Sequence, residues 1–175
     1  MGKVLKGALV EVEFLDDFSI IIRCNNKEFK PFEDLLIAEN NLMQENIRQA
    51  VLFAEYGIIY TMAIKQKNLY EREIGKLSAQ LDDVIREQIK EKGEKPTETS
   101  VKRLLYSDEK FVELQKKLND AEEIMTLLKQ ILEAFQHKKD CLLHFDVLER
   151  LMLKADVEEI KRESFENKEI PIKKW

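Results

Sequence analysis

The sequence is poor in residues that interrupt helices, because its 175 residues include only five glycines and three prolines. Its two cysteines, Cys24 and Cys141, lie far apart, which argues against a disulfide framework and fits a reducing cytosol. No apolar run approaches the ~20 residues of a membrane span. The first residues lack the apolar stretch of a secretory signal. We therefore expect a soluble, cytoplasmic protein with no membrane partner.

Signatures of catalysis are also missing. The sequence has no Gly-rich phosphate loop, no His-Glu-x-x-His segment and no Ser/His/Asp set with supporting context. Acidic pairs such as Asp82-Asp83 are typical of solvated helix faces. The sequence therefore predicts a protein that is not an enzyme and has no cofactor.

One group of residues has the spacing of metal ligands. His137, Cys141 and His144 lie at i, i+4 and i+7, so one helical face could present them to zinc. A closed site needs a fourth ligand, and only Cys24 or Asp140 offers itself. We favour two surface histidines beside a packed thiol, and we predict no metal site.

What the sequence does contain is charge and helix-forming residues. Charged residues make up 36% and apolar residues 44%, and the net charge is −5 with a pI near 5.3. This composition favours long helices. An acidic chain can bind nucleic acid only through a local basic patch.

Residues 1–30 differ from the rest. Residues 8–14 alternate apolar and acidic side chains, and residues 18–24 are rich in β-branched ones. Leu15-Asp16-Asp17 lies between them as a turn. We predict a small N-terminal β-hairpin, which must pack on a helix or pair across subunits because two strands alone are marginally stable.

Residues 31–155 predict a mainly α fold, a long antiparallel helical hairpin with coiled-coil-like packing. Pro31 opens the helical region, and the first long helix runs to about Lys92. Gly93 fits the position after its end. Thr97 is a good N-cap for a short helix at the turn, residues 98–106, and Ser107 is a second cap before the next long helix.

Each long helix has a heptad-like apolar stripe. The first stripe contains Ile47, Val51, Ala54, Ile58, Met62, Tyr70, Ile74, Leu77, Leu81 and Val84. The second contains Phe111, Leu114, Leu118, Ala121, Met125, Leu128, Leu132, Phe135 and Leu142, with a further line at Ile124 and Ile131. A bare hairpin cannot bury two lines per helix, so we predict a homo-oligomer. Alternatively, the β-hairpin covers the surplus. Residues 156–175 read as a charged tail, either frayed or a docking peptide.

Basic residues gather around the predicted hairpin tip. Arg86 and Lys90 are one helical turn apart and can point the same way. The candidate DNA-binding set is Arg86, Lys90, Lys92, Lys95, Lys102 and Arg103. Four glutamates lie among them, so a mixed solvated surface is the alternative. A second group contains Lys65, Lys67, Arg72 and Lys76 around Tyr70, for which we favour a core position.

Residues 40–155 resemble the UvsY-type phage recombination mediators. The resemblance consists of a long first helix, a polar turn at residues 92–97, a lead-in at residues 104–110 and a Cys with a basic pair at residues 137–141. The predicted β-hairpin is a departure from that family.

The resemblance implies a non-enzymatic, ring-like oligomer that binds single-stranded DNA. Such proteins help a recombinase displace the single-strand-binding protein, which makes both proteins expected partners. The location would then be the cytoplasm of a bacterial host. The family's DNA contacts late in the first helix match Arg86 and Lys90 best. Two alternatives are a coiled-coil scaffold or adaptor without nucleic-acid binding, and a small helical regulator of a larger enzyme.

Overall fold

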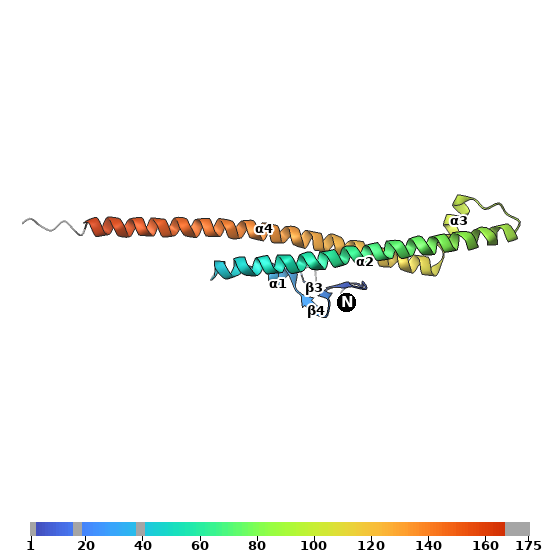
Figure 1. Cartoon of the computed structure of the whole chain (residues 1–175), viewed down its shortest axis with the longest axis horizontal. Coiled ribbons are helices and arrows are strands. Elements are labelled where there is room, and N and C mark those ends of the chain that lie inside the picture. The colour runs from blue at the N-terminus through green and yellow to red at the C-terminus, as the bar shows by residue number, and fades with distance from the viewer. Residues whose placement is uncertain (1–2, 16–18, 38–40, 167–175) are drawn as a thin grey trace, which may run out of the picture.

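Two long antiparallel helices form a rod (Figure 1). The computed structural model describes residues 3–15, 19–37 and 41–166, the last four as backbone only. The rod consists of α2 (Leu42–Glu91) and α4 (Glu109–Glu166), and the short helix α3 (Glu98–Leu105) joins them at one end. At 1.5 Å per residue the long helices measure ~75 and ~87 Å. The predicted mainly α fold, with a long hairpin and a short helix at its turn, is confirmed.

A four-stranded antiparallel sheet precedes the helices. Its strands are β1 (Val4–Leu5), β2 (Val10–Phe14), β3 (Ile20–Cys24) and β4 (Lys27–Phe29), in that spatial order. The predicted hairpin corresponds to β2 and β3, with Val12 opposite Ile22. Asn25 and Asn26 have φ of 50° and 60°, as the two-residue turn between β3 and β4 requires. The outer strands were not predicted because alternation cannot mark segments of two or three residues. The predicted turn at Asp16-Asp17 lies outside the described residues.

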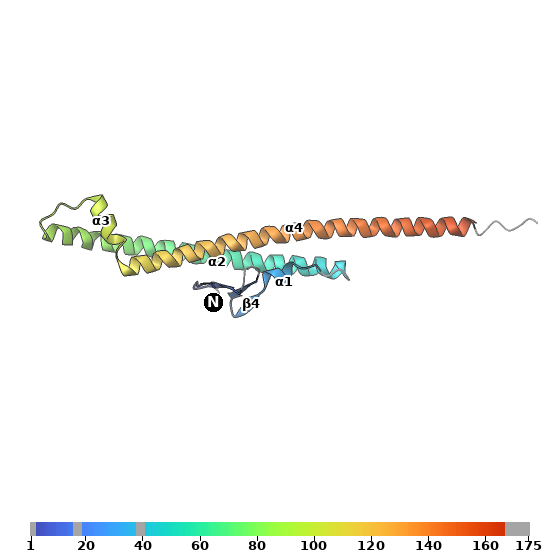
Figure 2. The same ribbon diagram turned by 180° about the vertical axis from the view of Figure 1, so that it is seen from behind.

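The sheet packs on the middle of the rod. Figures 1 and 2 show it with α1 (Pro31–Leu35) alongside α2, away from the α3 end. The main core contains Leu5, Val10, Val12, Ile20, Ile22 and Cys24 from the sheet, Tyr56, Ile59 and Ala63 from α2, and Ile124, Leu128, Ile131 and Phe135 from α4. The sheet therefore covers part of the apolar surface that the helices alone could not bury.

One side chain of α2 takes the place of a strand at the sheet edge. The Oε1 atom of Gln66, which is fully buried, accepts hydrogen bonds from the backbone N–H of Leu9 at 2.7 Å and of Val10 at 3.0 Å. Gly7 makes room for it, because a Cβ atom at Gly7 would overlap the Gln66 carboxamide. Gln66 thus fixes the start of β2 against α2.

The first half of α2 packs on α4 through a different face from the predicted stripe. Ile47, Val51 and Ile58 are 60%, 55% and 58% exposed. Two positions turn by about 200° on a helix, so Val51 and Ile58 face away from α4 and Ile47 lies at the margin of the contact. The line that packs inward has three-four spacing and contains Glu45, Gln49, Leu52, Tyr56, Ile59, Ala63, Gln66 and Tyr70. Its three polar members hide this line from a search for apolar spacing.

The later part of the α2 stripe agrees with the sequence. Tyr70 is buried, as expected of a core position. Ile74, Leu77 and Leu81 pack against a second, smaller core near α3. At the end of the stripe Ile85 is buried and Val84 is half exposed.

In α4 the buried line combines the two predicted lines, because Ala121, Leu128 and Phe135 of the first line are buried as well as the two isoleucines of the second. Ile124 and Ile131 are buried, whereas Met125 and Leu132 are half-buried at its margin. The same line continues through Lys138 and Leu142, which are both buried.

The far end of α4 is exposed along most of its length. The helix continues past residue 155 to Glu166 and extends beyond the start of α2 (Figure 1). Every residue from 147 to 162 is exposed. Residues 167–175, the rest of the predicted tail, lie outside the described part of the chain.

Candidate nucleic-acid interface

The tip of the hairpin is closed by a tightly bonded turn. The N–H of Gly93 donates to the carbonyl of Lys90 at 2.9 Å, and the N–H of Glu94 donates to that of Ile89 at 3.1 Å. These two bonds form a Schellman motif, which needs a left-handed residue after the helix end. Gly93 supplies it with φ of 78°, as the sequence predicts.

The helix α3 returns from this turn and packs on α2. The Thr97 hydroxyl accepts from Ser100 N at 3.2 Å, so Thr97 is the predicted N-cap. Val101 and Leu105 pack with Ile85, Ile89 and Phe111 in the small tip core. The cap of α4 is Asp108, whose Oδ1 accepts from Phe111 N at 2.9 Å. The predicted cap Ser107 instead donates to the Leu104 carbonyl.

Arg86 differs from the other predicted DNA-binding residues because it is held in ion pairs. Its guanidinium contacts Asp82 at 2.6 Å and Glu98 of α3 at 2.6 Å. The hydrogen bonds to Asp82 and then to Glu98 raise the pKa of Arg86. Arg86 therefore joins α3 to α2, and a phosphate would have to compete with two carboxylates for it.

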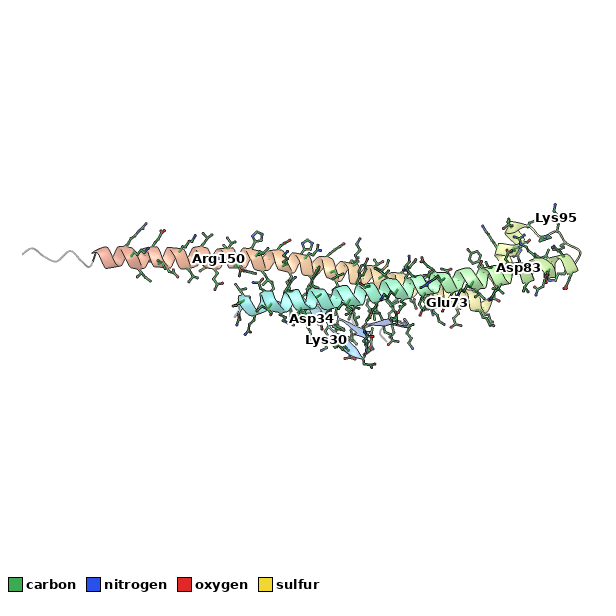
Figure 3. All side chains as sticks on the ribbon, in the orientation of Figure 1. Lys30, Asp34, Glu73, Asp83, Lys95 and Arg150 are labelled. Atoms are coloured by element: carbon green, nitrogen blue, oxygen red, sulfur yellow. The ribbon has the colours of Figure 1, made fainter. Side chains whose placement is uncertain are left out.

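The other five cations of the predicted set are exposed around the turn. They are Lys90, Lys92, Lys95, Lys102 and Arg103, and Figure 3 labels Lys95 at the tip. Within the described residues none of the five lies in an ion pair. The glutamates Glu87, Glu91 and Glu94 share this surface. The fold thus gathers five cations, contributed by α2, the turn and α3, within one short end of the rod.

The second basic group, around Tyr70, also contains one cation in an ion pair and several exposed cations. Lys67 pairs with Glu71 at 2.9 Å, a hydrogen bond that raises the Lys67 pKa. Lys65, Arg72 and Lys76 are exposed and lie on the outer side of α2, in line with the apolar residues from 47 to 58. Tyr70 is buried, so it is not available to stack on a base.

The opposite end of the rod exposes large apolar residues among charged ones. Two connected grooves of about 610 and 450 Å³ run between α2 and α4 and share Asn46. Their apolar lining consists of Leu42, Met43, Ile47, Ala50, Phe53, Leu143 and Leu153. Beyond them α4 exposes Leu148, Leu151, Met152, Val157 and Ile160. The two ends therefore differ in chemistry.

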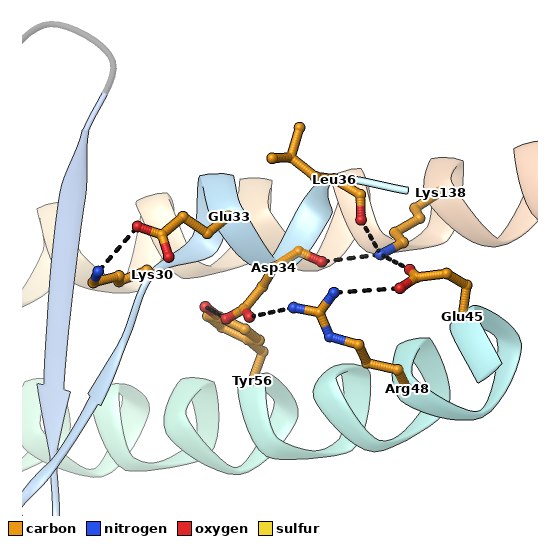
Figure 4. Close-up of polar contacts among 8 residues, drawn as sticks. All are labelled: Lys30, Glu33, Asp34, Leu36, Glu45, Arg48, Tyr56 and Lys138. Carbon is orange, nitrogen blue, oxygen red and sulfur yellow. Dashed lines mark hydrogen bonds and ion pairs between the residues drawn. The ribbon is translucent and has the colours of Figure 1, made fainter. Parts of the chain in front are cut away.

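A buried ion pair near this apolar end was not predicted from the sequence. The Lys138 ammonium donates to Glu45 Oε2 at 2.9 Å and to the backbone carbonyls of Leu36 at 2.8 Å and Asp34 at 3.0 Å (Figure 4). The side chains of Lys138 and Glu45 are 2% and 6% exposed. All three ammonium protons therefore have an acceptor.

Arg48 and Tyr56 extend this cluster. Arg48 contacts Asp34 at 3.2 Å and Glu45 at 3.3 Å. The Tyr56 hydroxyl donates to Asp34 Oδ2 at 2.9 Å. Burial and the Asp34 carboxylate raise the pKa of Tyr56. The cluster ties α1 to both long helices, and the only signal for it in the sequence was a lysine in an apolar line.

His137, Cys141 and His144 are all exposed on α4. The thiol is therefore not packed, contrary to the expectation. Among the residues that the structure describes, no three His, Cys, Asp or Glu side chains come together as a metal site would require. Within the same residues, no helix combines the length and apolarity needed to span a membrane.

Comparisons with known proteins give one similar structure. No protein-family model and no curated protein matches the chain. The crystal structure of the bacteriophage T4 recombination mediator protein UvsY is similar to it, with 12% identity and a TM-score of 0.47. The match covers 70% of this chain and 92% of that one. UvsY is a protein of the type that the sequence resembles.

Proposed function

We propose that this protein is a recombination mediator that assembles into an oligomer, binds single-stranded DNA and helps to load a recombinase. The observation that carries the proposal is the difference between the two ends of the rod. One end exposes apolar side chains suited to assembly, and the other exposes cations suited to phosphate. The role in recombination comes from the sequence resemblance, which also makes the recombinase and the single-strand-binding protein the expected partners.

Assembly is supported by the amount of exposed apolar surface. Ile47, Val51 and Ile58 line the outer face of α2, and the far end of α4 exposes several more large apolar residues. Full burial of one such side chain stabilises by roughly 1.5–3 kcal/mol. Association costs about 4–15 kcal/mol in lost freedom of motion. Burial of a handful of these residues from each copy is enough to offset that cost.

DNA binding is supported by the five exposed cations at the tip. On one copy the glutamates beside them reduce the local charge. In an oligomer the set repeats at each tip, so a strand could contact several copies in succession. Such binding tolerates any sequence and weakens with salt, because each neutralised phosphate releases counterions.

The first experiment measures fluorescence anisotropy of a labelled single-stranded oligonucleotide at about 50 and 200 mM salt, with the mass of the protein determined on the same sample. We expect an oligomer that binds more weakly at the higher salt. Each phosphate contact contributes roughly 0.7 to the slope of the logarithm of the binding constant against the logarithm of the salt concentration. Replacing Lys92, Lys95 and Lys102 by glutamine should therefore reduce the magnitude of this slope by about 2 per protomer.

The matched control replaces Lys27, Lys30 and Lys129 by glutamine, which removes the same charge from other surfaces. Equal weakening in both triple variants would reject the tip as the binding site. Arg86 is left unchanged, because its loss would also remove the ion pairs between α2 and α3. An oligomer with no affinity for DNA at low salt would leave the scaffold or adaptor as the function.

A further inference from the structure

An open cleft of about 740 Å³ lies between the edge of the sheet and the two long helices. Six consecutive residues, 3–8, form one wall along β1. The other walls are Tyr70 of α2 and Glu113, Lys116, Lys117 and Asp120 of α4. The cleft is therefore elongated along a strand, well away from the hairpin tip.

The strand β1 has a free edge on the side away from β2. Phe14 N donates to Lys3 O at 2.9 Å, and Leu5 lies opposite Val12. In an antiparallel pair, bonded and non-bonded residues alternate. Leu5 therefore bonds to β2, whereas the N–H and C=O groups of Val4 and Lys6 point outward. The outward groups of residues two apart are separated by about 7 Å along the strand, which matches the spacing of the bonding groups along a strand added beside it.

The charge around this edge is mainly positive. Lys3, Lys6, Lys116 and Lys117 line the cleft. Lys3 pairs with Glu123 at 2.5 Å and Lys117 with Glu113 at 2.8 Å.

Two lysines of the cleft are left over. Within the described residues, Lys6 and Lys116 have no carboxylate within ion-pair distance, and Asp120 is the acidic residue of the cleft outside the two pairs. A ligand that runs along β1 would thus meet two available ammonium groups.

We propose that this cleft binds an extended acidic peptide segment of a partner protein, which adds to the sheet as a fifth strand beside β1. Strand addition uses main-chain hydrogen bonds for affinity and side-chain contacts for selectivity. The outward groups of Val4 and Lys6 alternate donor and acceptor, which a peptide backbone complements. A phosphodiester backbone has only acceptors, so the edge favours peptide over nucleic acid. This proposal does not rest on DNA binding at the tip.

The test uses a fluorescein-labelled synthetic peptide of alternating aspartate and valine and the full-length protein. We expect the peptide to bind in a salt-sensitive manner, and a lysine-valine peptide of the same length to remain unbound. Combining Lys6→Glu with Lys116→Glu should weaken binding about tenfold or more, since close charge pairs are reversed. The control combines Lys110→Glu with Lys129→Glu, an equal charge change outside the cleft, and should retain the affinity.

A second variant tests strand addition separately from charge. Val4→Pro removes an N–H that faces away from β2, at an edge where proline is tolerated. It should abolish peptide binding while leaving the circular dichroism spectrum and thermal midpoint of the protein unchanged.

Three results would overturn the proposal. They are equal binding of the aspartate and lysine peptides, undiminished binding by the Lys6/Lys116 variant, and binding at the cleft of a single-stranded oligonucleotide but no peptide. The tip variant with glutamine at 92, 95 and 102 should keep its peptide affinity. Failure of the DNA proposal and failure of this one are therefore distinguishable.

Discussion

Replacing Lys138 by methionine should destabilise the protein more than any surface substitution. The ammonium group of Lys138 is buried and donates to three acceptors, one of which is the Glu45 carboxylate. Methionine has a similar length but no charge and no donor. The variant would therefore leave a buried carboxylate with Arg48 as its remaining cation, and two carbonyls of the α1 segment without this donor.

The expected magnitude follows from the burial of both partners. Breaking a buried ion pair by removing one side costs about 3–5 kcal/mol. In a protein of this size each kcal/mol lowers the thermal midpoint by roughly 2–4 °C. The Lys138→Met variant should therefore melt about 6–20 °C below the wild type at pH 7. Lys139→Met is the matched control, because Lys139 is the exposed neighbour on the same helix, and it should melt within about 2 °C of the wild type.

The pH dependence tests the role of Glu45 directly. Burial acts to raise the pKa of Glu45, but the hydrogen bonds and charges of Lys138 and Arg48 outweigh it, so the pKa is lowered from 4.5. Because the pKa of Glu45 is lower in the folded state than in the unfolded state, its ionised carboxylate stabilises the fold. This stabilisation is fully present at pH values above the unfolded-state pKa, and it is lost as the pH falls through the folded-state pKa. In Lys138→Met the main cation is gone, so the difference in melting temperature from the wild type should narrow as the pH falls below about 4.5.

Thermal unfolding followed by circular dichroism at several pH values, with protein concentration held constant, provides both measurements. A midpoint for Lys138→Met within 2 °C of that for Lys139→Met would refute the reasoning. So would a difference from the wild type that stays constant from pH 7 to pH 4. Either result would mean that the ion pair contributes little to the folded state.

Two further predictions concern the sheet and the cysteines. Gly7→Ala should displace the Gln66 carboxamide and leave the N–H groups of Leu9 and Val10 without their acceptor. We expect the free energy of unfolding, measured with urea, to fall by about 2–4 kcal/mol. An unchanged unfolding midpoint would contradict the role of Gln66. Burial raises the pKa of the Cys24 thiol, whereas Cys141 is exposed. Iodoacetamide should therefore modify Cys141 first and Cys24 only in denaturant, which peptide mass mapping would show. Equal rates of modification in the native protein would contradict the packing of β3.

The elements of the fold could be predicted where local chemistry determines them. Gly93 and Thr97 mark the tip because the Schellman motif and the helix N-cap each need a particular residue type at one position. Strand β2 shows the alternation of a half-buried strand, and β3 is rich in the β-branched residues that strands favour. These signals act over a few residues, so they can be detected without knowledge of the rest of the chain.

The packing face of α2 could not be predicted in this way. Its line from 45 to 70 contains Glu45, Gln49 and Gln66, and each of these forms at least one hydrogen bond with a residue distant in sequence. Gln49, for example, donates to the Phe135 carbonyl at 2.8 Å. A competing line at Ile47, Val51 and Ile58 is wholly apolar, but it lies off the face that packs on α4. Apolar spacing shows that a helix has apolar surface, but it does not show which surface meets which neighbour.

The sequence was sufficient to predict which cations lie at the tip, but not which of them form ion pairs. The sequence placed six cations near the tip, and the fold holds one of them, Arg86, between Asp82 and Glu98. That arrangement depends on how α3 returns along α2, because Glu98 belongs to another helix. The sequence likewise gave no indication that strand β1 would form a cleft with α4.

The Glu45–Lys138 pair also determines how the two long helices align along their length. In a seam of purely apolar residues, sliding one helix by seven positions, or about 10.5 Å at 1.5 Å per residue, would replace one apolar contact by another. Here the same slide would place Ile131 or Phe145 opposite Glu45 and leave two buried charges apart. The rod therefore has one length, and the basic tip lies at a constant distance from the apolar end in every copy.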